Sequence, residues 1–161
     1  MPQNGQVILD FLLKQRFMNF SGFIDIEQPI EKVVDVFVIA EKKWQEGFVK
    51  KKLLSGREGE DGAVSMMYYE NGKHQMQLKE TVIQNNLLHS LEASYHHKHM
   101  SNIMRYSFTK INETCTRYSV EVEYTKISWV MPRLIAILFP NRYRKPAQKW
   151  MENFKLFVER E

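Results

Sequence analysis

The chain has 161 residues, of which 43% are hydrophobic and 26% are charged, and its net charge is +4. This length and composition place it with ordinary soluble globular proteins that bury a substantial core in one domain. The single Cys115 excludes an internal disulfide framework and any zinc site built from several cysteines, and it fits a reducing compartment. We therefore expect a cytoplasmic protein.

The first segment, residues 1–16, has an apolar patch but not the features of a signal peptide. No basic stretch precedes the patch in MPQNGQVILDFLLKQRF, and no small-residue cleavage site follows it. We interpret residues 1–16 as an N-terminal extension whose structure the sequence does not predict. They belong to one domain that spans residues 1–161.

The next residues predict a strand and then two short helices. FMNFSGFIDI, residues 17–26, has the composition of a strand. Pro29 suits the first turn of a helix, and apolar residues follow it with helical spacing as far as Ala40. EKKWQEGF, residues 41–48, predicts the second short helix.

Beyond Gly47 the apolar pattern changes to a period of two. It predicts strands over residues 48–55, 63–70, 73–84, 87–97, 102–111 and 115–127, and then a long amphipathic helix from Lys145. Consecutive strands cannot bury one face against themselves unless the sheet curls. We therefore expect an α+β fold in which a curved antiparallel sheet wraps around the C-terminal helix.

Hairpin geometry predicts which side chains face that helix, because directly opposed residues lie on one face of a sheet. Asn71-Gly72 is a strong turn signal. Two-residue turns at Asn71-Gly72 and Asn85-Asn86, with a three-residue turn at 112–114, give these pairs: Tyr69 with His74, Met67 with Met76, Val82 with His89, Glu80 with Leu91, Phe108 with Tyr118, Tyr106 with Val120 and Met104 with Val122.

The predicted inner face is rich in methionine and tyrosine rather than in valine and isoleucine. Methionine packs adaptably, and the tyrosine hydroxyl needs a hydrogen-bond partner. Such a face suits a cavity for a mainly apolar small molecule. A solid core that uses methionine as filler is an equally good interpretation of the inner face alone.

Three segments carry a family resemblance: QPIEKVVDVF at 28–37, KETVIQNNLLHSL at 79–91 and WMENFKLFVERE at 150–161. With the order of elements, they resemble the START-like, helix-grip (SRPBCC) superfamily, and within it the bacterial polyketide cyclase/dehydrase and lipid-transport group. The resemblance covers roughly residues 17–161 and implies a seven-stranded sheet that grips the C-terminal helix around a hydrophobic cavity. It implies no particular reaction, because the fold hosts transporters, sensors, cyclases and chaperone activators.

Glu80 and His89 are the polar residues of most interest, because the predicted pairing turns both inward. A carboxylate beside an imidazole in an apolar cavity could bind the polar head of a ligand or move a proton. A structural ion pair is the simpler interpretation, and the one we favour.

The stretch SYHHKHM, residues 94–100, holds three histidines. His97 and His99 would share the inner face at the rim of the cavity, but the segment offers no carboxylate or cysteine as a further ligand. We therefore predict a polar hairpin tip near the cavity mouth, and no metal site.

Together these observations predict binding or transport of a small hydrophobic molecule, such as a lipid, polyketide or isoprenoid, with no cofactor. Two alternatives stay open: a cyclase/dehydratase-type enzyme that uses Glu80 and His89, and a protein-interaction module of the chaperone-activator kind. The candidate ligand-binding residues are Met67, Tyr69, Met76, Leu78, Glu80, His89, Leu91, Tyr95, Met104, Tyr106, Phe108, Tyr118, Trp150 and Phe154.

The dispersed basic residues argue against nucleic-acid binding. WVMPRLIAILF and RYRKPAQK leave a peripheral membrane contact through residues 129–149 as the minority interpretation, and the first of these runs is too short to span a bilayer. The sequence does not indicate an oligomeric state.

Overall fold

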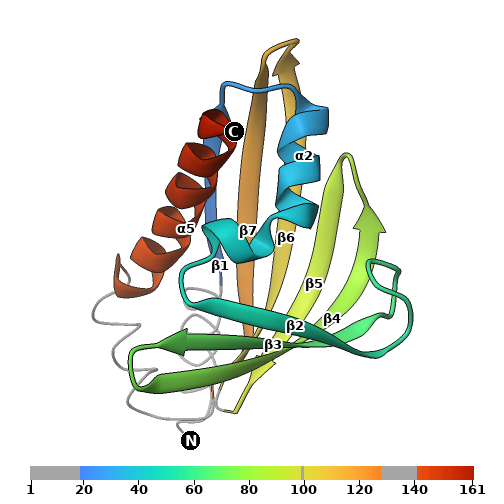
Figure 1. Cartoon of the computed structure of the whole chain (residues 1–161), viewed down its shortest axis with the longest axis vertical. Coiled ribbons are helices and arrows are strands. Elements are labelled where there is room, and N and C mark those ends of the chain that lie inside the picture. The colour runs from blue at the N-terminus through green and yellow to red at the C-terminus, as the bar shows by residue number, and fades with distance from the viewer. Residues whose placement is uncertain (1–18, 99, 128–140) are drawn as a thin grey trace, which may run out of the picture.

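A computed structural model describes residues 19–98, 100–127 and 141–161 (Figure 1). The elements in chain order are β1 (Asn19–Ile26), α2 (Ile30–Ile39), α3 (Glu41–Trp44), β2 (Phe48–Ser55), β3 (Val64–Asn71), β4 (His74–Asn86), β5 (Ser90–His97), β6 (Met100–Asn112), β7 (Cys115–Ile127) and α5 (Asn141–Arg160). The predictions made for the N-terminal extension, for His99 and for the apolar run at 129–139 concern residues outside the described ones. No helix in the described part combines the length and apolar character that a membrane crossing requires.

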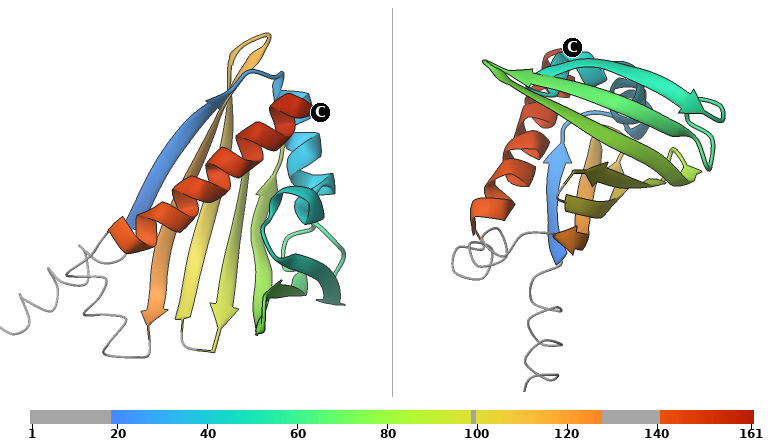
Figure 2. Two further views of the ribbon diagram at one scale, coloured as in Figure 1. Left: turned by 60° about the vertical axis from the view of Figure 1, so that its left-hand side comes forward. Right: turned by 90° about the horizontal axis from the view of Figure 1, so that it is seen from below.

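All seven strands form one antiparallel sheet in the order β1-β7-β6-β5-β4-β3-β2. β1 pairs with β7, so β1 and β2 lie at opposite edges of the sheet, and α2 and α3 connect them. The sheet curves strongly, and α5 runs obliquely across its face (Figure 2). The predicted α+β helix-grip architecture, with two short helices after the first strand, is confirmed.

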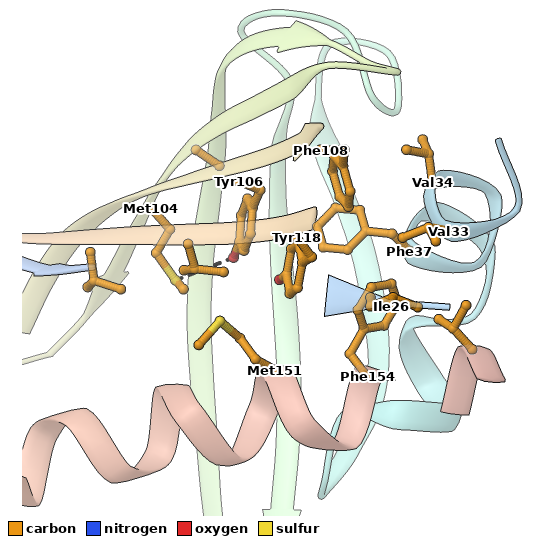
Figure 3. Packing of buried hydrophobic residues seen from close by; sticks show 14 of the residues in the cluster. Ile26, Val33, Val34, Phe37, Met104, Tyr106, Phe108, Tyr118, Met151 and Phe154 are labelled. Carbon is orange, nitrogen blue, oxygen red and sulfur yellow. Dashed lines mark hydrogen bonds between the residues drawn. The ribbon is translucent and has the colours of Figure 1, made fainter. Parts of the chain in front are cut away.

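An amphipathic pattern fixes how α5 lies on the sheet. Met151, Phe154 and Val158 recur at helical spacing and are buried, whereas Leu156 on the same helix is exposed. The side chains of Met151 and Phe154 point from α5 towards the sheet, where they approach Tyr118 (Figure 3). The helix therefore contributes its apolar stripe to the core.

Phe37 is the point at which α2 joins this core. Its ring lies 5.1 Å from Tyr106, 5.2 Å from Phe108 and 5.8 Å from Phe154, measured between ring centroids. Tilted and edge-on contacts of this kind stabilise aromatic clusters beyond the area they bury. Sheet, α2 and α5 thus meet in one aromatic cluster.

The predicted register of β6 and β7 is confirmed: Phe108 pairs with Tyr118, Tyr106 with Val120 and Met104 with Val122. Between β3 and β4 the prediction is wrong by two residues, because the turn is Gly72-Lys73 and Asn71 pairs with His74. A shift of two residues keeps every side chain on its predicted face, since the side-chain period of a strand is two.

The predicted register of β4 and β5 is also wrong. Glu80 pairs with Tyr95, and not with Leu91. Residues 87–89 form the turn, so β5 begins only at Ser90. A bulge at Ile83 then offsets the register of β4 against β5 by one residue. His89 consequently lies in an exposed turn rather than opposite Val82.

Candidate ligand-binding site

A cavity of about 480 Å³ lies between the concave face of the sheet and the helices. This volume falls within the range of roughly 300–1,000 Å³ that is usual for small-molecule sites. Strands β2 to β7 supply most of the wall, and side chains of α2, α3 and α5 complete it. The wall is mainly apolar and aromatic.

Most of the predicted ligand-binding side chains line this cavity. They are Met67, Tyr69, Met76, Leu78, Glu80, Leu91, Tyr95, Met104, Tyr106, Tyr118 and Trp150. Phe108 and Phe154 do not line it, because both pack inside the aromatic cluster around Phe37. His89 does not line it either, because it lies in the turn that precedes β5.

A buried ion pair replaces the predicted pairing of Glu80 with His89. Lys51 Nζ lies 2.6 Å from Glu80 Oε1, and the two side chains are 21% and 6% exposed. Glu80 is on β4 and Lys51 is on the edge strand β2, so β3 lies between them in the sheet. A carboxylate can be buried at this position because an ammonium group balances its charge.

Two tyrosines extend this pair into a polar network along the cavity wall. Tyr95 is hydrogen-bonded to Glu80, and the hydroxyl of Tyr106 lies 3.2 Å from that of Tyr95. An ionised carboxylate can only accept hydrogen bonds. Tyr95 therefore donates to Glu80, and Tyr106 donates to Tyr95.

Burial keeps these phenols in their neutral form. It raises the pKa of Tyr95 well above the usual value, and the neighbouring Tyr106 and Glu80 raise it further. Burial also raises the pKa of Tyr118, with a smaller contribution from Tyr106. The cavity thus offers neutral hydroxyls, and not phenolates, to a bound molecule at physiological pH.

Other polar groups are distributed along the wall. The hydroxyl of Tyr69 donates to Gln45 Oε1 at 2.6 Å. Trp44 Nε1 and Asn102 Oδ1 are buried and have no hydrogen-bond partner among the described residues. His97 lines the cavity near the end of β5, so it has the predicted inward orientation, and its position at the rim stays a prediction.

Lys51 is a charged wall residue that was not predicted from the sequence. It belongs to a run of three lysines in β2, and alternation along the strand leaves the middle one facing inward. The signal that could have found it is the buried carboxylate of Glu80, which needs a cation on a nearby strand.

Cys115 is not among the described residues that line the cavity. Burial raises the pKa of the Cys115 thiol, and the carboxylates of Glu27 and Asp25 add to that rise, which disfavours the nucleophilic thiolate. Within residues 19–98, 100–127 and 141–161 no three histidine, cysteine or acidic side chains are grouped so that they could hold a metal ion. Cys115 is a free buried thiol, and the cytoplasmic location stays a prediction.

Solved structures share this architecture along nearly their whole length. Ara h 8.0201 superimposes with a TM-score of 0.71 at 9% identity, over 89% of this chain and 98% of that one. A START superfamily protein from Mycobacterium smegmatis gives 0.67 at 12%, over 89% and 98%. The Zhui aromatase/cyclase from Streptomyces sp. R1128 gives 0.68 at 9%, over 88% and 93%. The chain thus has the START-like helix-grip fold.

At these identities the similarity concerns the fold alone. No protein-family model matches the sequence. No curated protein matches it significantly.

Proposed function

We propose that this protein binds a small, mainly apolar molecule in the cavity between the sheet and α5. The observation that carries the proposal is the cavity itself, about 480 Å³ with walls that are mostly apolar and aromatic. A molecule that fills it removes apolar surface from water, which contributes about 25 cal/mol for each Å² buried. Release of the same molecule elsewhere would make the protein a carrier.

The catalytic alternative has less support from the geometry. A reaction that uses Glu80 and His89 together requires the two side chains to meet, and His89 lies in the exposed turn at residues 87–89. Glu80 is instead held by Lys51 and Tyr95. A carboxylate fixed by an ion pair and a hydrogen bond is suited to recognition.

The protein-interaction alternative requires an exposed apolar groove. The large apolar side chains exposed in the described part are distributed over several elements, among them Phe23 on β1, Ile39 on α2, Leu54 on β2 and Leu156 on α5. Single exposed apolar side chains are ordinary on protein surfaces and do not define a docking site. Ligand binding is therefore the function that the structure supports best.

Nile red, a neutral dye whose fluorescence rises in apolar surroundings, tests the proposal. We expect one molecule to bind per chain, and Leu78→Trp to weaken binding by about tenfold or more, because the indole occupies cavity space. Leu156→Trp places the same side chain on the exposed face of α5 and should leave binding unchanged. Fluorescence titration measures both variants.

Two results would count against this proposal. Wild-type protein that leaves the dye fluorescence unchanged would mean that the cavity does not admit such a molecule. Equal binding by the two tryptophan variants would place the dye on the surface of the protein.

A further inference from the structure

We infer that the cavity selects a neutral amphiphile, an apolar molecule that carries a hydroxyl group, over a carboxylate of the same size. The inference rests on the proposed function and names the chemical class of its ligand. It follows from the charge balance of the cavity wall and from the hydrogen-bonding groups beside Glu80.

Charge balance is the first argument. The ionisable side chains that line the cavity in the described part of the chain, apart from tyrosines, are Lys51, Glu58, Glu80 and His97. The Lys51 ammonium is 2.6 Å from the Glu80 carboxylate, and Glu58 is an exposed residue of the loop between β2 and β3. The charge of the lysine is thus already balanced within the wall.

A ligand carboxylate would meet an unfavourable environment at this position. To contact the ammonium of Lys51, it would have to lie beside the carboxylate of Glu80, whose residue is only 4% exposed. Two negative charges a few ångströms apart in a water-poor site repel each other strongly. A neutral head group avoids this repulsion.

Hydrogen-bonding capacity is the second argument. The Glu80 carboxylate has about four acceptor positions, and Lys51 and Tyr95 are two of its partners. Ser65 lies directly opposite Glu80 in the sheet, is buried and lines the cavity, and its hydroxyl can both donate and accept.

A ligand hydroxyl matches these groups in both directions. It can donate to the carboxylate of Glu80 and accept from the hydroxyl of Ser65. An alcohol or a phenol has both capacities in one group. An ionised carboxylate can only accept, so it cannot donate to Glu80.

Displacement of bound Nile red by 1-decanol and, in a separate titration, by decanoate tests this preference. The two compounds have equally long chains and differ in the head group. At about pH 8, where carboxylic acids are ionised and ordinary histidines are neutral, we expect wild-type protein to prefer the alcohol by about tenfold or more.

Glu80→Gln supplies the reciprocal experiment. It removes the negative charge at nearly constant shape and leaves the ammonium of Lys51 without its carboxylate, so the preference should move towards decanoate by about tenfold or more. Glu121→Gln removes an exposed carboxylate on the opposite face of β7, outside the cavity wall, and should leave the preference unchanged.

The outcomes separate the two proposals. Absence of Nile red binding would overturn the proposed function, and this inference with it. Dye binding together with an equal or stronger competition by decanoate would overturn the inference alone. If Glu80→Gln does not fold, the comparison of 1-decanol with decanoate on the wild type decides the inference by itself. If Glu80→Gln folds, an unchanged preference for the alcohol would also overturn the inference.

Discussion

Replacing Phe154 by alanine is expected to lower the free energy of unfolding by about 3–5 kcal/mol. Phe154 is completely buried on α5, and its ring centroid lies 4.9 Å from that of Trp44 and 5.1 Å from that of Tyr118. With Phe37 at 5.8 Å, it connects α5 to α2, α3 and the sheet. Alanine would leave a cavity that these rigid rings cannot fill, so the large end of the range applies.

Leu156→Ala is the matched control for this variant. Leu156 lies two residues further along α5 and is 49% exposed, so its truncation should cost about 1 kcal/mol or less. Urea unfolding followed by circular dichroism measures both variants. Equal losses would show that α5 does not dock on the sheet through Phe154.

Replacing Lys51 by methionine is expected to lower the free energy of unfolding by about 2–4 kcal/mol, which is somewhat less than for a fully buried pair. The variant leaves the Glu80 carboxylate, only 6% exposed, without the ammonium that lies 2.6 Å away in the wild type. Lys52→Met, at the exposed neighbouring position of β2, should change stability by about 0.5 kcal/mol or less.

A double variant distinguishes the loss of the pair from the loss of packing. Lys51→Met combined with Glu80→Leu removes both charges, so it should recover most of the stability that the single variant loses. Urea unfolding of the wild type, Lys51→Met, Glu80→Leu and the double variant gives the coupling energy between positions 51 and 80. A double variant less stable than Lys51→Met alone would contradict a destabilisation caused by the unpaired carboxylate.

The sequence predicted the fold well because its signals are local and repeated. Alternation of apolar residues along the strands and the apolar stripe of α5 are properties of single elements, and together they imply a curved sheet around a helix. The β6–β7 register was right although the turn is Glu113-Thr114 and not the predicted 112–114, because an irregularity between Lys110 and Asn112 takes up the difference of one residue. At β4–β5 the bulge at Ile83 and the three-residue turn produce no change in the apolar pattern, so the predicted register was wrong.

Strand alternation and strand register also decide which residues of the candidate site could be predicted from the sequence. Met67, Leu78 and Tyr95 kept their inner face because the register errors at their positions were even numbers of residues. The pairing of Lys51 with Glu80 depends on how β2 is placed against β3. The long loop between Ser55 and Val64 carries no information on that register.

Phe108 and Phe154 show a second limit. Both have the inward orientation that was predicted, but the ring of Phe37 covers them and closes this part of the interior. The position of α2 over the sheet is set by long-range packing, and the alternation within the strands contains no signal for it. The sequence therefore could not distinguish the inward side chains that line the cavity from those that belong to a solid core.

The most direct measurement of the central claim locates a bound molecule inside the protein. Met67, Met104 and Met151 line the cavity, whereas Met66 is on the opposite face of β3. In protein labelled with ¹³C at the methionine methyls, ring currents of bound Nile red should shift the signals of those three methyls and saturate at one equivalent, and Met66 should not respond. A response of Met66 with unchanged cavity signals would contradict ligand binding between the sheet and α5.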